Sequence, residues 1–257
     1  MPVPLFFQVL GVGPPLIILH GLLGSSVNWR TIAGSLSAQH RVFLLDQRNH
    51  GQSPHSDTMS YPELATDLYA FMDEQRLPQA TLLGHSMGGK VAMLAALQHP
   101  ERVAGLIAVD IAPKRYRRDY AQFLQAMRRV DLLRVARRAD AEIQLAETIA
   151  DIRVRRFLLQ NLVSGRDGYR WRISLTGIEE GLPNMLGFPE LGPSRRYWEK
   201  TMFIRGEQSD YIVPDDYPAI HARFPLAKIV TIAGATHWVH VDQPQRFVAA
   251  VQRFFQQ

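Results

Sequence analysis

The stretch TLLGHSMGGKV, residues 81–91, fits two incompatible kinds of site. Its glycines and Lys90 nearly complete a phosphate-binding P-loop. That motif needs Ser or Thr directly after the lysine to ligate magnesium, and Val91 stands there instead. The same stretch contains Gly-x-Ser-x-Gly centred on Ser86, the pattern of a sharp strand-to-helix turn that exposes a nucleophilic serine. We therefore expect a nucleophile at Ser86 and no phosphate loop.

The flanking residues supply the strand and the helix that such a turn requires. ATLLG (residues 80–84) is a short apolar run that predicts a buried strand, and GGKVAMLAAL (residues 88–97) predicts an Ala-rich helix that ends before Pro100. Gly84 and Gly88 suit their places because a tight turn and close helix packing leave no room for a Cβ atom. The local sequence thus predicts strand, turn and helix around Ser86.

Composition excludes several classes of protein. The chain has 257 residues, 46% hydrophobic and 21% charged, which suits one large globular α/β domain and excludes extensive disorder. It contains no cysteine, so disulfides, thiolate metal sites and a cysteine nucleophile are excluded, and no HExxH spacing occurs. We expect no metal and no cofactor. The N-terminal segment lacks a basic region and a long apolar run, so we expect no signal peptide, no membrane contact and a cytoplasmic location.

Short apolar runs alternate with helical patterns along most of the chain. The runs are continuously apolar, as in parallel strands that are covered on both faces. Helical patterns separate them near residues 25–38, 61–76 and 88–98, and again near 215–223 and after Pro244. The sequence therefore predicts a mostly parallel, doubly wound sheet. Its strands are PLIILHG, RVFLLDQ, ATLLGHS, VAGLIAVD, TMFIRG and AKIVTIAG.

The alternation stops between residues 114 and 195. This segment is predicted to be helical throughout, with no strand, and to carry two apolar helix faces, one through Phe123 and Met127 and one through Val154 and Phe157. Because both of its ends return to the same sheet, we expect residues 114–195 to form a helical lid inserted before the last two strands. Residues 1–113 and 196–257 then make up the core domain.

The net charge of +5 is concentrated in the predicted lid. Residues 114–172 contain 15 Lys and Arg against 7 Asp and Glu, a balance of +8, so the rest of the chain sums to −3. No recognisable nucleic-acid module accompanies this charge, and we expect no nucleic-acid partner. The two remaining interpretations are a solvated face of Arg-rich helices and an anion-attracting rim over a binding site.

A serine nucleophile needs a base and an acid that follow it in this kind of sheet. His237 lies in a Gly-Ala loop directly after the last predicted strand, whereas His240 lies nearer a helix start and is expected to be a structural cap or a packing residue. We expect His237 to be the base. Asp110 and Asp210 each follow a predicted strand, at the edge where ligands of open α/β sheets bind, so either can orient the histidine.

The oxyanion of acyl transfer needs two preorganised backbone N–H donors. One is expected from Met87, the residue after the nucleophile. The other is expected from Leu22, in the loop HGLLG that follows the strand PLIIL. His20 at the start of this loop is expected to brace it rather than to take part in catalysis.

With these motifs in view, the chain resembles the α/β-hydrolases over nearly its whole length, and among them the YbfF-type esterases. The resemblance implies hydrolysis of short to medium acyl esters or thioesters, including acyl-CoA. It also implies an acid at Asp110, whereas the wider superfamily pattern fits Asp210, and the two stay open. The likeness is carried by HGLLGS, LDQRNHGQSPHS, GHSMGGKVAM, VDIAP, RFLLQNLV with YRWRISL, and AGATHWVH.

The sequence therefore predicts a serine hydrolase that acts on a small-molecule ester or thioester through an acyl-enzyme. Carbon–carbon bond hydrolases of the same fold keep the same triad and remain an alternative. A non-catalytic binding protein on a hydrolase scaffold is a second alternative, disfavoured because every triad position is filled.

Overall fold

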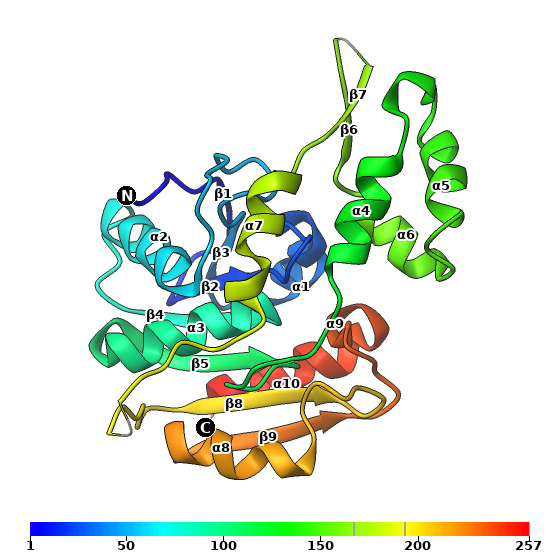
Figure 1. The fold of residues 1–257 in the computed structure, drawn as a ribbon. Coiled ribbons are helices and arrows are strands. Elements are labelled where there is room, and N and C mark those ends of the chain that lie inside the picture. Colours follow the sequence, from blue (N-terminus) through cyan, green and yellow to red (C-terminus); the bar gives the residue numbers. More distant parts are fainter. Residues whose placement is uncertain (167, 193, 257) are drawn as a thin grey trace.

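A seven-stranded sheet runs through the part of the chain that the computed structural model describes, residues 1–166, 168–192 and 194–256 (Figure 1). Its order is β1-β3-β2-β4-β5-β8-β9, and only β1 runs antiparallel to its neighbour. The mostly parallel sheet that the sequence predicts is confirmed. The strands are β1 (Phe7–Leu10), β2 (Pro15–Leu19), β3 (Arg41–Leu45), β4 (Ala80–His85), β5 (Val103–Val109), β8 (Thr201–Gly206) and β9 (Ala227–Ile232).

Helices cover both faces of the sheet, as a doubly wound fold requires. One face packs against α2 (Tyr61–Glu74), α3 (Met87–Gln98) and α8 (Tyr217–Arg223). The other packs against α1 (Arg30–Leu36) and α10 (Pro244–Gln256), with the short α9 (Val239–Asp242) before α10.

The strands are continuously apolar because helices pack against both faces of the sheet. Neighbouring strand residues point to opposite faces, so Leu82 belongs to the core beside α3 while Leu83 belongs to the core beside α1. Every residue of β4 is buried. A strand enclosed on both faces gains from apolar side chains at every position, which removes the alternation seen in half-exposed strands.

The sequence did not predict β1. It is only four residues long and lies at the sheet edge, where Val9 is 46% exposed. So short a run, interrupted by Gln8, carries no periodic signal.

The inserted segment between β5 and β8 contains helices and a β-hairpin. The prediction that no strand interrupts it is wrong: β6 and β7 pair antiparallel and project from the helices (Figure 1). Gly168, with φ of +106°, lies at the turn, in a backbone conformation that other residues rarely adopt. The elements are α4 (Ala121–Arg129), α5 (Arg138–Ala146), α6 (Ile152–Leu159), β6 (Leu162–Gly165), β7 (Gly168–Trp171) and α7 (Leu175–Met185).

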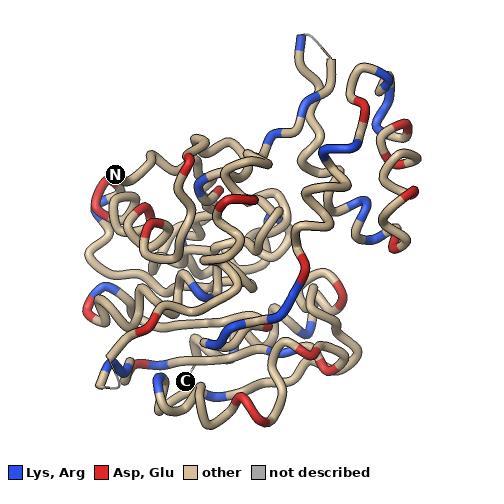
Figure 2. Tube along the Cα trace, viewed as in Figure 1, with Lys and Arg blue, Asp and Glu red and all other residues tan. Residues whose placement is uncertain are grey.

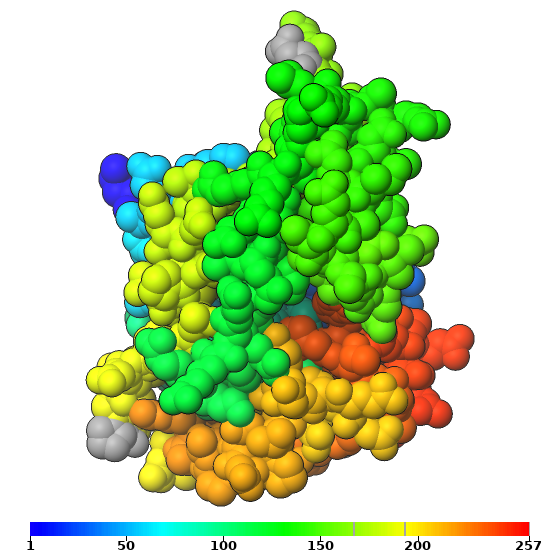
Figure 3. All heavy atoms as spheres, turned by 45° about the vertical axis from the view of Figure 1, so that its right-hand side comes forward, coloured from blue at the N-terminus to red at the C-terminus, as the bar shows by residue number. Residues whose placement is uncertain are grey.

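This insertion lies over the carboxyl ends of the central strands. The Asn161 side chain, just after α6, donates to the carbonyl of Leu23 in the loop after β2 (2.8 Å). Figure 3 shows the insertion, in green, above the orange and red C-terminal segment, with a hollow between them. None of the helices in the described ranges has the length and apolarity of a membrane span.

Candidate functional site

Ser86 occupies a strained turn between β4 and α3. Its φ of +51° and ψ of −115° fall where non-glycine residues rarely lie, and such strain is concentrated at functional sites. A Cβ atom on Gly84 would lie 2.1 Å from the carbonyl oxygen of Gly88, and one on Gly88 would lie 2.4 Å from that of Leu19. The two glycines are therefore needed because the strand, the turn and the helix are in backbone contact.

His237 follows β9 in the loop before α9, and its ring lies against Asp110. Nδ1 of His237 is 2.8 Å from Oδ2 of Asp110. Because a carboxylate only accepts, Nδ1 must carry the proton of the neutral ring, which leaves Nε2 able to accept a proton. His237 and Ser86 line the same cavity.

Asp110 is fully buried directly after β5, and its own φ is +49°. Its carboxylate accepts hydrogen bonds from the backbone of Gly206 (3.0 Å) and from the hydroxyl of Ser209, in addition to His237. These donors come from the end of β8 and the loop after it. They fix the carboxylate and hence the imidazole.

Asp210, which the sequence made an equal candidate for the acid, does not contact His237. It is exposed, and its carboxylate forms an ion pair with Arg118 at the start of the insertion. The structure therefore brings His237 together with Asp110 and holds Asp210 away from that pair. Ser209, which no sequence motif marked, is the residue of this loop that donates to the buried carboxylate.

The loop after β2 places Leu22 beside Ser86 and Met87, and all three residues line one small pocket. Met87 is the first residue of α3, where backbone N–H groups have no partner within the helix. The next residue of the loop, Leu23, has φ of +61° and donates its N–H to Nε2 of His50 (3.0 Å).

Buried neutral histidines hold this loop in place. Nδ1 of His20 donates to the carbonyl of Gly21 (2.8 Å) and Nε2 accepts from the backbone of Gln47 (3.0 Å), so His20 braces the loop as expected. Burial lowers the pKa of His50 to about 3. A neutral ring is what its hydrogen bond from Leu23 requires.

Two further buried histidines, His85 and His240, line the same cavity as His237. Nε2 of His85 donates to the carbonyl of His237 (2.9 Å), and burial holds the pKa of His85 well below its ordinary value. His240 stacks on Trp29, with ring centres 3.9 Å apart, which agrees with the packing role expected for it. Burial lowers the pKa of His240 to about 3.

Comparison with known proteins identifies the fold family. The model of the alpha/beta hydrolase fold family matches residues 14–244. This chain belongs to the α/β-hydrolase family. It is 40% identical to a Danio rerio protein named sn-1-specific diacylglycerol lipase ABHD11 over 99% of this chain and 83% of that protein.

Two further comparisons bear out the resemblance to the YbfF-type esterases. Esterase YbfF of Escherichia coli is 33% identical over 93% of this chain and 92% of its own. A solved structure titled marine microorganism esterase is 42% identical, covers 98% of this chain and 99% of its own, and superposes with a TM-score of 0.94.

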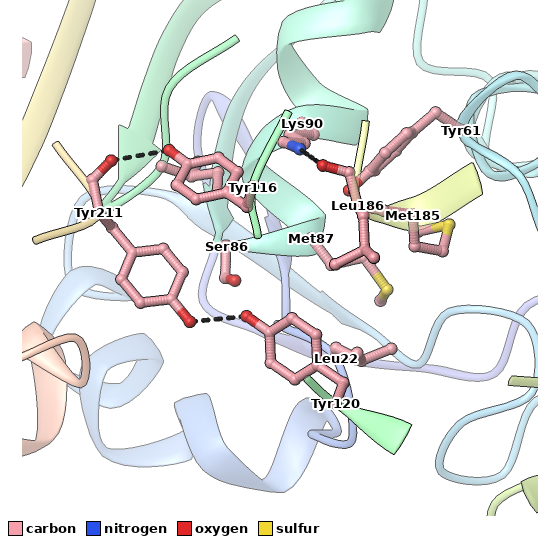
Figure 4. A pocket seen from close by; sticks show the side chains of 11 residues that line it. Leu22, Tyr61, Ser86, Met87, Lys90, Tyr116, Tyr120, Met185, Leu186 and Tyr211 are labelled. Carbon is pink, nitrogen blue, oxygen red and sulfur yellow. Dashed lines mark hydrogen bonds between the residues drawn. The ribbon is translucent and has the colours of Figure 1, made fainter. Parts of the chain in front are cut away.

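In this α/β-hydrolase, two cavities meet at Ser86. The first is a small pocket of about 20 Å³, closed by Lys90, Tyr61 and Met185 (Figure 4). The second is a groove of about 530 Å³ between α6 and the loop that carries His237 and Trp238. Four residues line both cavities: Leu22, Ser86, Tyr120 and Tyr211.

Lys90 is buried, being 1% exposed, at the closed end of the small pocket. Its Nζ donates to the carbonyls of Leu186 and Gly187 in the returning insertion. Burial, with Arg115 and Lys114 nearby, lowers its pKa to about 7. A neutral amine still has the two N–H donors that these two carbonyls need.

Basic positions are spread along the insertion (Figure 2), and only some of their side chains line the groove. Arg118 and Arg128 pair with Asp210 and Glu179. Arg153 and Arg156, both on α6, line the groove, and Arg153 is paired there with Asp242. Within the described ranges, no cluster of three or more His, Asp or Glu side chains could hold a metal ion.

Proposed function

We propose that this protein is a serine hydrolase that cleaves small-molecule carboxylic esters or thioesters through an acyl-enzyme. The observation that carries the proposal is the contact between His237 and Asp110, together with the strained turn that presents Ser86 to the same cavity. The names of the relatives, esterase and lipase, support ester hydrolysis.

The proposed reaction has two halves. The Ser86 hydroxyl attacks the acyl carbon while Nε2 of His237 takes its proton. The tetrahedral intermediate then expels the alcohol or thiol, which leaves with that proton, and an acyl ester of Ser86 remains. Water attacks this ester with His237 again as base, and the carboxylic acid and free Ser86 are released.

We assign the acid of the triad to Asp110 rather than Asp210. Asp110 is buried, bonded to Nδ1 of His237 and fixed by Gly206 and Ser209, whereas Asp210 is paired with Arg118. Its role is to orient the imidazole and to stabilise the imidazolium that forms during attack.

We further propose that the N–H groups of Leu22 and Met87 bind the oxyanion. Both residues lie beside Ser86 in the small pocket, and the bonds from His20 and His50 keep the loop of Leu22 rigid. Donors that are fixed in advance cost no reorganisation when charge develops.

Residues 114–195 are proposed to act as a lid on a core formed by residues 1–113 and 196–257. The groove lies between α6 of this segment and the His237 loop. Arg153 and Arg156 lie along it, so thioesters with an anionic leaving group, such as acyl-CoA, are proposed substrates.

Labelling with a fluorophosphonate tests this function against a binding protein on the same scaffold. The native protein should be labelled and should hydrolyse p-nitrophenyl acetate, whereas Ser86→Ala should do neither. Hydrolysis of vinylogous diketones in preference to every ester would instead favour the alternative of a carbon–carbon bond hydrolase, which uses the same triad.

A further inference from the structure

The small pocket and the groove differ in which catalytic groups face them. Met87, a proposed oxyanion donor, lines only the small pocket. His237, the proposed base, lines only the groove. The cavities therefore lie on different sides of the bond that Ser86 attacks.

This difference assigns the two parts of a substrate to the two cavities. His237 must hand its proton to the departing oxygen or sulfur, so the leaving group has to lie on the side of His237. That side is the groove. The acyl chain, bonded to the same carbon but pointing away from the leaving group, enters the small pocket.

We propose that the small pocket restricts this enzyme to short acyl groups, and that the groove accepts a bulky, largely apolar leaving group. The inference rests on the proposed function. The small pocket has a cavity volume of about 20 Å³, against about 530 Å³ for the groove. An acetyl or propionyl group fits such a space, whereas an octanoyl chain does not.

Hydrogen bonds hold the residues at the closed end of the small pocket in place. The Tyr61 hydroxyl donates to the carbonyl of Met185 (2.8 Å), and Lys90 donates to those of Leu186 and Gly187. These bonds tie the end of the insertion to α2 and α3. A longer acyl chain would have to break them and leave buried polar groups without partners.

A pair of tyrosines separates the pocket from the groove. The hydroxyls of Tyr120 and Tyr211 are 2.6 Å apart, and both rings line both cavities (Figure 4). Tyr211 is fixed, because its ring stacks on His237 at 3.6 Å and its carbonyl accepts from the Tyr116 hydroxyl at 2.7 Å. Tyr120 comes from the insertion, and its ring contact with Phe123 is longer, at 6.3 Å, and tilted. It is therefore the removable half of the partition.

The groove has the composition that suits a large leaving group. Val154 and Phe157 of α6 face it together with Trp238, and the Phe157 and Trp238 ring centres are 5.6 Å apart. Its volume of about 530 Å³ is in the range of sites that take drug-sized molecules. Arg156 adds positive charge along the same wall, where Arg153 is paired with Asp242 and Asp151 also faces the groove.

The test measures kcat/KM for p-nitrophenyl acetate and octanoate and for phenyl and 2-naphthyl acetate, whose leaving groups are of similar acidity. Within each pair, the ratio cancels any general loss of activity. In the wild type we expect kcat/KM for p-nitrophenyl octanoate to be at least about tenfold below that for the acetate, since hydrophobic pockets discriminate between substrates by roughly this amount. We also expect kcat/KM for 2-naphthyl acetate to exceed that for phenyl acetate.

Variants test which of the two cavities determines each ratio of kcat/KM. Tyr120→Ala should raise the octanoate-to-acetate ratio at least about tenfold by joining the cavities, whereas Tyr120→Phe, which keeps the ring, should leave it unchanged. Phe157→Ala should lower only the naphthyl-to-phenyl ratio.

Two results would overturn the inference while leaving ester hydrolysis intact: a wild-type preference for octanoate, or an octanoate-to-acetate ratio that Tyr120→Ala does not raise. If the wild type hydrolysed none of the four esters, the proposed function itself would fail.

Discussion

The imidazole of His237 lies 2.8 Å from the carboxylate of Asp110, although 127 residues separate the two in the chain. Replacing Asp110 by Asn should lower kcat by roughly four orders of magnitude, because the amide no longer selects the productive tautomer. The matched change Asp210→Asn removes only a partly exposed ion pair with Arg118 and should alter kcat by less than about threefold. Steady-state rates with p-nitrophenyl acetate measure both, and a larger loss in Asp210→Asn would reverse the assignment.

Two of the three arginines of α6 line the groove and lead to a prediction on ionic strength. If Arg153 and Arg156 attract the leaving group, kcat/KM for acetyl-CoA should fall as salt rises, and that for neutral p-nitrophenyl acetate should not. Arg156→Gln should weaken the salt dependence, whereas Arg129→Gln, at an exposed site of α4 outside both cavities, should preserve it. Parallel salt profiles for the two substrates would rule out such steering.

Burial of Lys90 leads to a prediction on stability. Its pKa is about 7 in the folded protein against 10.5 ordinarily, so between these values the unfolded chain holds a proton that the folded protein lacks. The contribution of Lys90 to the free energy of unfolding therefore rises with pH across this window, by at most about 1.4 kcal/mol per pH unit.

Urea denaturation of the wild type and of Lys90→Met checks this sign. The free energy of unfolding of the wild type, minus that of the variant, should increase from near neutral pH toward pH 10. Methionine fills the space of the lysine stem without a titrating group, so it is a suitable reference. A constant difference would show that Lys90 stays charged when buried.

The nucleophile could be predicted from sequence because its determinants are local. Gly84, Ser86 and Gly88 lie within five residues, and the contact that excludes a Cβ atom on Gly84 is with Gly88 of the same turn, whereas Gly88 itself meets Leu19 of the neighbouring strand. The apolar runs of the central strands could also be recognised in the sequence. A strand that is buried on both faces favours an apolar residue at every position, whichever strands it pairs with.

The choice of acid could not be predicted, because both candidates follow a strand. Asp110 is selected by Gly206, Ser209 and His237, which lie 96, 99 and 127 residues away in the chain. The hairpin β6–β7 was missed for another reason. Leu162 and Val163 directly continue the apolar pattern of α6, so periodicity alone does not mark where the helix ends.

The contact between Tyr120 and Tyr211 could not be predicted from the sequence either. Tyr120 precedes α4 and Tyr211 follows β8, 91 residues later. Tyr120 fits the apolar face of the helix that follows it, and Tyr211 lies in a loop without periodic pattern. Only the folded chain brings the two hydroxyls together beside Ser86.

The central claim is that Ser86 carries the acyl group during turnover. Mixing the protein with excess p-nitrophenyl acetate, quenching in acid within milliseconds and mapping the digested protein by mass spectrometry tests it directly. We predict one acetyl group on the peptide that contains Ser86, formed as fast as the initial release of p-nitrophenol and missing in Ser86→Ala. Acetylation of another residue at that rate, or undiminished turnover by Ser86→Ala, would contradict the account.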